Sequence, residues 1–351
     1  MARIGLIDVD GKLVNLALMK LSTYHKRLGD TVVLNPLSPE GLDRTYVSLI
    51  FTKSRQKAIH RYSHFPNVSF GGTGYSLTTT LPPEVEGTPP DYDLYSVEDV
   101  YNSIKQRPGS KESIWEKAAQ IQGSGIGFTT RGCPRKCSFC AVPTKEGALH
   151  QVGTISDIVN PSSRMITILD NNFTSDPLCI PKLIEIKQRG LIVNLTQGID
   201  VRLVTDEIAK ALSEVQHWGS LHYAWDLTQS EKSVFDGIKL LSNFVKRSNH
   251  MCYVLTGFDT SFEEDVYRVT KLVEQGIRPY IMLYQDPTGE APPQRTEFEQ
   301  KRLSHFKRWI NLPKAIYKKV PFAEFQDWIN AQAKLKGAHG ASQLSLDLCC
   351  A

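Results

Sequence analysis

The sequence predicts an α/β protein in three parts: a Rossmann-like parallel-sheet domain over residues 1–105, a (βα)6 partial TIM barrel over 106–290, and a short helical C-terminal extension with a tail over 291–351. Two observations lead to this prediction. Short apolar runs alternate with helical patterns, which favours parallel sheets with crossover helices. From residue 124, six strand patterns follow one another at about 30 residues per unit, which is typical of a partial barrel.

Composition agrees with a soluble globular protein of two or more domains. The chain has 351 residues, of which 41% are apolar and 22% charged. Its net charge of +4 is too small to indicate nucleic acid by itself. No apolar run is long enough to span a membrane, and acidic residues interrupt any secretory signal. We therefore expect a cytoplasmic protein with no membrane association.

The N-terminal part contains four expected strands and one clear helix. The helix covers Asn15–Arg27, with apolar residues at roughly helical spacing, and Gly29 ends it. A segment rich in Pro, Gly and acid, Thr79–Asp93, is expected to be a loop. Gly71–Gly74 could cradle a phosphate, although glycine pairs after strands are a weak signal. The expected strands are Arg3–Ile7, Thr31–Leu34, Tyr46–Phe51 and Asn67–Phe70.

The barrel part alternates strands with helices, except that the helix between the first two strands is poorly marked. The expected strands are Gly125–Thr130, Met165–Asp170, Leu191–Gln197, Leu221–Asp226, Met251–Thr256 and Pro279–Tyr284. The expected helices are Pro181–Arg189, Thr205–Val215, Lys232–Lys246 and Phe262–Gln275.

Three cysteines directly follow the first barrel strand. Cys133, Cys137 and Cys140 have the spacing C-x3-C-x2-C, and Gly132 allows a tight turn before them. Loops at the carboxyl ends of barrel strands carry active sites. Thiolates are the usual ligands of iron–sulfur clusters, so these three can bind three corners of a cubic cluster. Since no fourth cysteine lies nearby, the fourth iron is left open for another ligand.

This arrangement resembles the radical S-adenosylmethionine (SAM) superfamily over roughly residues 120–290. The resemblance implies a [4Fe–4S] cluster on Cys133, Cys137 and Cys140, whose open iron chelates SAM. It also implies an electron donor such as flavodoxin or ferredoxin, and a 5′-deoxyadenosyl radical that abstracts hydrogen from a substrate. The sequence identifies neither the substrate nor a catalytic residue.

The resemblance also assigns SAM-binding residues to the later strand ends. In that superfamily a polar motif after the second strand holds the SAM amino group. The resemblance also implies that polar residues after the third and fourth strands contact the ribose, the carboxylate or the substrate. It further implies that Gly257 leaves room for the adenine ring. Ordinary turns, surface ion pairs and packing are the alternatives for each. By position, Tyr284 and Gln285 could face substrate. The cofactor-binding candidates are Phe139, Asp170, Asn171, Asn172, Gln197, Asp200, Arg202, Asp226 and Gly257.

Two other interpretations of the cysteine loop remain open. A zinc site could combine the three cysteines with His150 as a Cys3His set. An electron-transfer cluster could take a fourth ligand from elsewhere. Cys179 and Cys252 are expected to be buried, and Cys349 and Cys350 receive no role. The chain therefore has no second cysteine nest, which argues against branches of the superfamily that need an additional cluster.

The N-terminal part resembles the cobalamin-binding domain that precedes some radical SAM barrels. That domain often binds cobalamin through an Asp-x-His-x-x-Gly loop. Here the turn after the first strand contains Asp8, Asp10 and Gly11, without a histidine at the required spacing. We therefore favour a related fold without cobalamin, and keep cobalamin-dependent methyl transfer as an alternative function.

The C-terminal extension is basic and aromatic. Between Arg295 and Lys336, ten Lys and Arg residues stand against four Asp and Glu residues. Such a surface could bind RNA or DNA, so a non-catalytic iron–sulfur or zinc protein that binds nucleic acid is the alternative from another class. We favour helices that pack their aromatic side chains against the barrel and leave their lysines in solvent.

Overall fold

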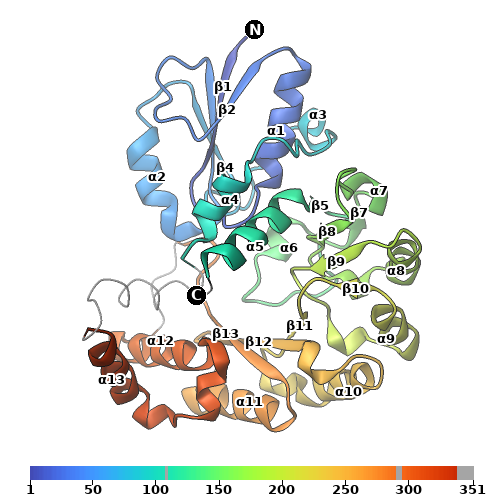
Figure 1. Cartoon of the computed structure of the whole chain (residues 1–351), viewed down its shortest axis with the longest axis vertical. Coiled ribbons are helices and arrows are strands. Elements are labelled where there is room, and N and C mark those ends of the chain that lie inside the picture. Colours follow the sequence, from blue (N-terminus) through green and yellow to red (C-terminus); the bar gives the residue numbers. More distant parts are fainter. Residues whose placement is uncertain (107–109, 290–294, 338–351) are drawn as a thin grey trace.

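The computed structural model describes residues 1–106, 110–289 and 295–337, and its N-terminal part is a parallel four-stranded sheet (Figure 1). The strand order is β2-β1-β3-β4, and all pairs are parallel. The α/β class is therefore confirmed for this part. The elements are β1 (Arg3–Asp8), α1 (Leu16–Arg27), β2 (Thr31–Leu34), β3 (Arg44–Ser48), η1 (Thr52–Ser54), α2 (Arg55–Tyr62) and β4 (Val68–Gly71).

Helix α1 begins and ends where the sequence predicts. The side chain of Asn15 accepts a hydrogen bond from the N–H of Leu18, which caps the first turn. Leu18 is buried in the cluster that contains Ile4 and Leu6 of β1. Gly29 follows the last turn with a φ of +82°, a conformation that favours glycine.

Three helices join this sheet to the barrel, and the sequence analysis missed them: α3 (Pro83–Glu86), α4 (Val97–Ile104) and α5 (Lys111–Gly123). The missed signal for α4 is its capping box, in which Ser96 and Asp99 cap each other's backbone N–H groups. Helices α4 and α5 share one apolar core with Val14, Met19 and, from the first barrel strand, Ile126. This core crosses the domain boundary predicted at residue 105, and that boundary stays a prediction.

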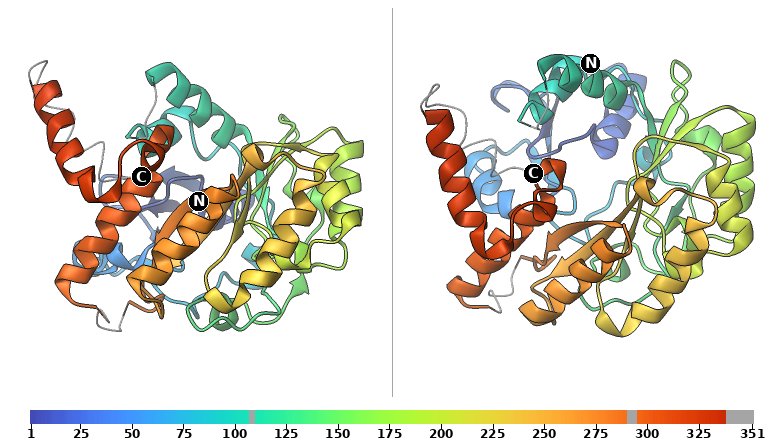
Figure 2. Two further views of the ribbon diagram at one scale, coloured as in Figure 1. Left: turned by 90° about the horizontal axis from the view of Figure 1, so that it is seen from below. Right: turned by 60° about the horizontal axis from the view of Figure 1, so that its bottom comes forward.

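All six predicted barrel strands are present, and each pairs in parallel with its neighbour in its sheet. They form an arc, with the helices that follow them on its outer side (Figure 2). The strands are β5 (Gly125–Gly127), β8 (Met165–Ile168), β9 (Ile192–Leu195), β11 (Leu221–Ala224), β12 (His250–Thr256) and β13 (Arg278–Leu283). The helices are α8 (Cys179–Gln188), α9 (Asp206–Ser213), α10 (Glu231–Ser242) and α11 (Phe262–Glu274).

The arc is interrupted between its third and fourth strands. A short strand, β10 (Gln216–His217), pairs with β9, so β11 belongs to a separate sheet with β12 and β13. The two sheets are bridged by one backbone hydrogen bond of 2.8 Å, from the N–H of Ile199 to the carbonyl of His222. Gly198 allows this approach, because a Cβ there would lie 2.7 Å from the same carbonyl oxygen. The six strands of the expected partial barrel are thus divided between two sheets that share one core.

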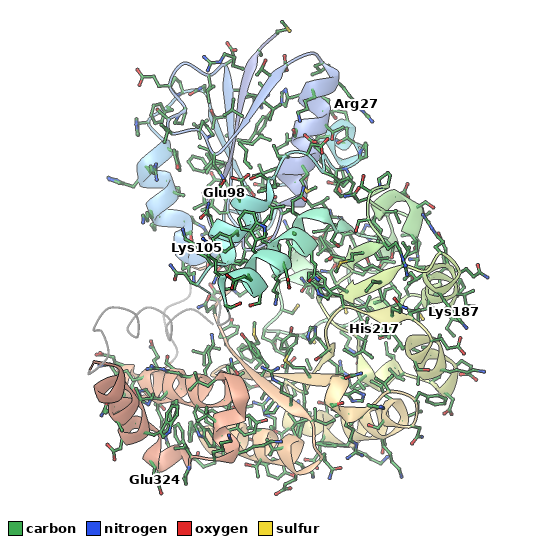
Figure 3. All side chains as sticks on the ribbon, viewed as in Figure 1. Arg27, Glu98, Lys105, Lys187, His217 and Glu324 are labelled. Carbon is green, nitrogen blue, oxygen red and sulfur yellow. The ribbon has the colours of Figure 1, made fainter. Side chains whose placement is uncertain are left out.

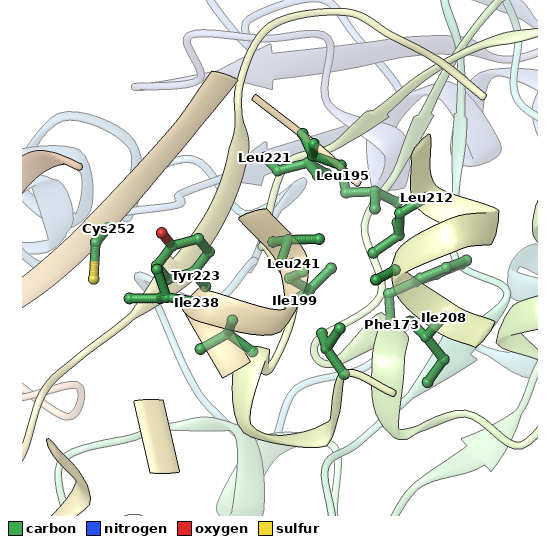
Figure 4. Close-up of a cluster of buried hydrophobic side chains, with 14 of the residues drawn as sticks. Phe173, Leu195, Ile199, Ile208, Leu212, Leu221, Tyr223, Ile238, Leu241 and Cys252 are labelled. Atoms are coloured by element: carbon green, nitrogen blue, oxygen red, sulfur yellow. The ribbon is translucent and has the colours of Figure 1, made fainter. Parts of the chain in front are cut away.

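One apolar core fills the space between the two sheets and the outer helices. Figure 4 shows its centre, where Phe173, which follows β8, and Leu195 of β9 lie near Leu212 of α9, with Tyr223 of β11 further along the same core. Charged side chains such as Lys187 and Glu324 lie at the periphery of the molecule (Figure 3). Burial of these apolar side chains is the main stabilising contribution to the fold.

The crossover between the first two barrel strands contains only short elements, which explains why its helix is poorly marked. They are β6 (Thr130–Arg131), α6 (Val142–Lys145), β7 (His150–Gln151) and α7 (Ile155–Ile158). Strands β6 and β7 form a small antiparallel pair. The expected strand Gly125–Thr130 is therefore divided into β5 and β6, and the cysteine loop lies between β6 and α6.

The C-terminal extension packs on the last barrel strand through α12 (Glu297–Asn311). Asn311 exchanges two hydrogen bonds, 2.9 and 3.0 Å long, with the backbone of Ile281 and so covers part of the open edge of β13. Phe306, Trp309 and Phe322 pack on one another and on the barrel core. This agrees with the packing interpretation. The chain continues through η6 (Pro313–Lys318), η7 (Phe322–Glu324) and α13 (Phe325–Gly337), while Cys349 and Cys350 lie outside the described residues.

Across the described ranges, none of the helices has the length and apolar character needed to cross a bilayer.

We expect the protein to lose stability between about pH 6.5 and pH 4 because of His250, at the start of β12. Its ring is buried and its Nδ1 lies 3.3 Å from the hydroxyl of Tyr223. Burial lowers the pKa of His250 to about 4. The ring is therefore neutral in the folded chain but becomes protonated near pH 6.5 when unfolded, so acid favours the unfolded chain. Full stability is present above pH 6.5, and about 2–3 kcal/mol is lost by pH 4.

Urea unfolding of the wild type and His250→Gln at pH 7 and pH 4.5 checks this prediction. The variant should lose about 2 kcal/mol less than the wild type between the two pH values. His217 and His222, whose pKa values are also lowered by burial, contribute equally to both proteins. Equal losses in both proteins would contradict the assignment.

Candidate functional site

The cysteine loop begins with a turn that only glycine fits. Gly132 has a φ of +80°, and a Cβ there would lie 2.2 Å from the carbonyl oxygen of Ala148. The next residue is held by a 3.2 Å hydrogen bond from the N–H of Cys133 to the carbonyl of Gly147. Further on, the N–H of Cys140 donates to the carbonyl of Cys137 at 3.0 Å. The backbone therefore returns on itself and brings the three cysteines to one side of the loop.

Gly132→Ala should destabilise the protein much more than Gly147→Ala. Both positions have positive φ, so each alanine costs about 1–2 kcal/mol of conformational strain. Only the Gly132 variant also collides with backbone, whereas a Cβ at Gly147 meets nothing within 4 Å. We expect about 3 kcal/mol or more for Gly132→Ala, measured by urea unfolding. Equal losses for the two variants would show that the close approach to Ala148 does not matter.

The three thiols are free, half-buried and close enough to influence one another. The amide Nδ2 of Asn172 donates to Cys133 Sγ at 3.4 Å, and the N–H of Val142 lies 3.5 Å from Cys140 Sγ. Burial raises the pKa of the Cys140 thiol, and the nearby thiols of Cys137 and Cys133 raise it further. A bound metal ion would favour the thiolate forms.

The three thiols are of the ligand type that iron–sulfur clusters use. Within residues 1–106, 110–289 and 295–337, no group of three or more His, Cys, Asp or Glu side chains is arranged to hold a metal ion. The three thiols share one loop without a disulfide, and N–H groups of Asn172 and Val142 point toward two of the sulfurs.

Asp170 and Asn171, just after β8, form hydrogen bonds with the residues that lead into the cysteine loop. Asp170 is buried and accepts hydrogen bonds from the N–H of Thr129 at 2.6 Å and from the hydroxyls of Thr129 and Thr130. Asn171 accepts from the N–H of Gly132 at 2.9 Å. The SAM contact predicted for Asp170 is untested, and both oxygens of its carboxylate accept hydrogen bonds from Thr129 or Thr130 here.

A buried ion pair, Lys182 with Asp176, also contacts Thr129 just before the cysteine loop. Lys182 of α8 donates to the hydroxyl of Thr129 at 2.8 Å, to Gln151 at 3.0 Å and to Asp176 at 2.5 Å. Lys182 and Asp176 are both nearly inaccessible to solvent. The residues that lead into the cysteine loop are thus connected to α8 by a network in which these polar groups have hydrogen-bond partners.

Asp200 lies between two arginines, one of which belongs to the cysteine loop. It accepts from Arg202 at 2.6 and 3.0 Å and from the Nε of Arg135. Burial alone would raise the pKa of Asp200, but the hydrogen bonds from Arg202 and Arg135 outweigh it and hold the pKa below its ordinary value. The cluster therefore carries two cations and one anion, which leaves a net positive charge beside Cys137.

Asp226, at the end of β11, faces the same region. Its carboxylate accepts from the N–H of Leu255 at 3.0 Å. Burial raises the pKa of Asp226, and its charge interacts with those of Arg202, Cys137 and Cys140. The end of the third strand thus contacts the cysteine loop through Asp200 and Arg135, and Asp226 lies close enough for its charge to act on the same loop.

Gly257 has another structural reason to be glycine. Its φ is +81°, and a Cβ there would lie 3.0 Å from Leu303 of α12. The position therefore faces the C-terminal extension. The adenine site predicted at Gly257 remains a prediction.

An aromatic row runs from the cysteine loop to the last two strand ends. The ring centroid of Phe139 lies 5.7 Å from that of Phe258, which lies 4.7 Å from that of Tyr284. Tyr284 was predicted by position to face substrate, and the structure connects it to the cysteine loop through Phe258. Gln197 and Gln285 are exposed at their strand ends.

Three residues of this site were not predicted from the sequence. Arg135, Thr129 and Thr130 contact Asp200 or Asp170. Arg135 lies inside the C-x3-C-x2-C motif, so its position was visible, but its partner depends on how β9 lies against β8. The two threonines look like ordinary strand residues in the sequence.

Comparisons with known proteins give little further information. No protein-family model matches the chain. An uncharacterized methyltransferase of Pyrococcus horikoshii is 28% identical over 99 residues, which cover 26% of this chain and 22% of that protein. The crystal structure of Streptococcus suis SuiB bound to S-adenosylmethionine is 12% identical, with a TM-score of 0.38 over 62% of this chain and 61% of that one. That likeness carries no argument about function.

Proposed function

We propose that this chain is a radical SAM enzyme that cleaves SAM reductively and uses the 5′-deoxyadenosyl radical on a substrate. The observation that carries the proposal is the cysteine loop. Cys133, Cys137 and Cys140 are free thiols with C-x3-C-x2-C spacing, and they follow the first strand of a parallel six-strand arc. Thiolates are the preferred ligands of iron–sulfur clusters, and three of them leave one iron of a cube open.

The three cysteines would hold a [4Fe–4S] cluster, which when bound supplies the electron for cleavage of the SAM sulfonium. The chain's own groups prepare the loop for this ligand. Asp170 and Asn171 hold the entry to the loop through Thr129 and Gly132. The N–H of Asn172 points to the Cys133 sulfur, which would moderate the charge of a thiolate there.

Arg202 and Arg135 would attract the carboxylate of SAM. Both guanidinium groups contact Asp200, so the three side chains carry one net positive charge. Arginine offers several fixed N–H donors, and these suit a carboxylate. Gln197 and Asp226 would remain for the amino group and ribose of SAM, because Asn171 and Asn172 already contact Gly132 and Cys133. The row Phe139–Phe258–Tyr284 offers apolar faces for the adenine ring.

Reductive cleavage of SAM tests the proposal directly. Protein reconstituted anaerobically with iron and sulfide is incubated with SAM and dithionite, and 5′-deoxyadenosine is measured by chromatography. We expect product in proportion to protein, and none without reductant. Protein with an intact cluster that binds SAM but forms no 5′-deoxyadenosine would overturn the proposal. It would favour the non-catalytic iron–sulfur alternative instead.

Methyl transfer is a second candidate, favoured by the name of the archaeal relative. Cobalamin would be the methyl carrier expected for an N-terminal domain of this type. The turn after β1 offers Asp8 and Asp10, whose carboxylates accept hydrogen bonds from the N–H groups of Gly11 and Ile50. Corrinoid retained by protein purified from cobalamin-supplemented cells would support this candidate. Protein free of corrinoid would oppose it.

A further inference from the structure

A cavity of about 240 Å³ lies at the carboxyl ends of β1 and β2 in the N-terminal sheet. Asp8 is the last residue of β1, and Asn35 directly follows β2. Helix α4, which lies at this end of the sheet (Figure 1), contributes Val100 and Asn102 to the cavity wall. In open α/β sheets, ligands bind outside the carboxyl ends of the strands. The cavity therefore lies where this type of fold places its ligands.

The cavity has buried inner walls and an exposed rim. Tyr95 and Val100 are buried, whereas Leu13 and Asn102 are exposed to solvent. A small molecule can therefore enter without displacing the fold. Its volume lies below the ~300–1,000 Å³ of pockets that hold drug-sized ligands. The ligand that fits is accordingly small, close to a single sugar ring in size.

Asp8 brings a carboxylate to this cavity, and no cation among the described residues forms an ion pair with it. Its Oδ1 accepts from the N–H of Gly11 at 2.9 Å, and its Oδ2 accepts from the hydroxyl of Tyr95 at 2.8 Å. Burial raises the pKa of Asp8, and the hydrogen bonds from Tyr95, Gly11 and Asn15 offset this effect only in part. A carboxylate has about four acceptor sites, so at least one remains for a ligand.

Two amide groups bring hydrogen-bond donors to the same cavity. Asn35 Oδ1 accepts from the N–H of Asp8 at 2.8 Å, and Asn102 Oδ1 accepts from the Nζ of Lys105 at 3.0 Å. These bonds fix the orientation of both amides, and neither Nδ2 donates to any of the described residues. Asn35 has a φ of +47°, and no other described residue except glycines has a positive φ. Such backbone conformations cost free energy and cluster at ligand sites.

The charges around the cavity exclude an anionic ligand. Its described lining residues include Asp8 and Asp99 but no Lys, Arg or His. Asp99 already accepts from the N–H and the hydroxyl of Ser96, at 2.8 and 2.6 Å. A phosphate or carboxylate would therefore meet two acids, and Lys105 reaches only the Asn102 side chain at the rim. A simple ammonium ion is also a poor match, because it accepts no hydrogen bond from the two amides.

We propose that this cavity binds a neutral ligand with neighbouring hydroxyl groups, a sugar ring of about pentose size. A hydroxyl both donates and accepts hydrogen bonds, so one hydroxyl can donate to Asp8 while another accepts from the amide of Asn35. Tyr95 and Val100 offer apolar surface to the carbon atoms of the ring. The proposal goes beyond the radical chemistry proposed above, because the cavity shares no residue with the cysteine loop.

Saturation-transfer difference NMR of the full chain tests the site without relying on activity. The probe is methyl β-D-ribofuranoside, whose ring form is fixed, and we expect saturable binding. The 2-deoxy analogue should bind about tenfold more weakly, because it lacks one hydroxyl for the carboxylate. Ribose 5-phosphate should bind no more tightly than the neutral sugar. Absence of saturable binding, equal binding of the deoxy analogue, or tighter binding of the phosphate would each overturn the proposal.

Substitutions then locate the bound sugar. Asp8→Asn keeps the shape of the side chain and should weaken binding about tenfold. Asn35→Gly should weaken it severalfold, and glycine adopts the positive φ of this position without strain. Asp43→Asn is the matched control, because Asp43 accepts from the N–H of Arg3 at the opposite edge of the sheet. It should bind the sugar as the wild type does.

Urea unfolding of each variant shows that the binding measurements refer to folded protein. Unchanged binding in both Asp8→Asn and Asn35→Gly would place the sugar elsewhere and would contradict the proposal. Equal weakening in all three variants would contradict a site at this cavity as well. Weakening in the two cavity variants alone would support it.

Discussion

Cys137→Ala is expected to abolish both iron binding and SAM cleavage. Cys137 is the central cysteine of the loop, and its charge interacts with those of Cys133, Arg202 and Asp226. Removal of one of three thiolate ligands leaves two irons of a cube without a protein ligand. Loss of groups that only support metal ligands already costs about 10–100-fold, so we expect 5′-deoxyadenosine formation to fall more than about 100-fold. Iron and sulfide assays after anaerobic reconstitution measure the first effect.

Cys252→Ala is the matched control for this result. Cys252 lies on β12 and is fully buried, and its sulfur contacts the backbone of Tyr253. The control loses one buried sulfur and should keep its iron, its sulfide and its cleavage activity. If Cys137→Ala retained the iron content of the wild type, the cysteine loop would not be the cluster site. If Cys252→Ala lost iron as well, the effect would come from instability of the fold.

The strands of the barrel could be predicted because each is a short apolar run that ends in polar residues. The predicted strand Met251–Thr256 and the observed β12 differ by one residue. Every second residue of this strand is buried, which is the alternation that a sheet imposes on a sequence. The C-x3-C-x2-C motif could be recognised in the sequence for a similar reason, because its spacing depends only on neighbouring residues of the chain.

Contacts between distant segments could not be predicted in the same way. The resemblance assigned Asp170 to SAM, which stays a prediction, but the sequence did not indicate that its carboxylate accepts hydrogen bonds from Thr129 and Thr130. Which of several partners a carboxylate meets depends on how two strands lie side by side, and one sequence does not contain that information. The break between β9 and β11 has the same origin, because Gly198 resembles any other loop glycine until His222 is placed beside it.

The buried ion pair of Arg268 on α11 could have been predicted from the sequence. The buried face of this helix contains Val269 and Leu272, and by helical spacing also Asp265 and Arg268. A charged pair on the apolar face indicates a buried ion pair. In the structure both side chains are completely buried, and Arg268 donates to Asp265 at 2.6 Å. This arginine ties together the ends of two barrel strands.

Arg268→Leu should destabilise the protein by about 3–5 kcal/mol, the effect of removing one partner of a buried ion pair. The guanidinium donates to the carbonyls of Trp225, Asp226 and Leu255 at 2.7–2.8 Å. Leucine leaves these carbonyls and the Asp265 carboxylate buried without this donor, and each such group costs about 1–3 kcal/mol. Because Asp226 and Leu255 lie at the mouth of the barrel, the variant should also lower any activity there. Urea unfolding measures the loss of stability.

Lys271→Met, one turn further along α11, is the control for this effect. Lys271 pairs with Glu231, but its side chain is 32% exposed, and exposed pairs contribute about 1 kcal/mol or less. The double variant Arg268→Leu, Asp265→Leu should recover part of the lost stability, because it removes the unpaired carboxylate. Recovery should be incomplete, since three strand-end carbonyls still lack a donor. If Arg268→Leu alone were as stable as Lys271→Met, the strand ends would not depend on Arg268 for their stability.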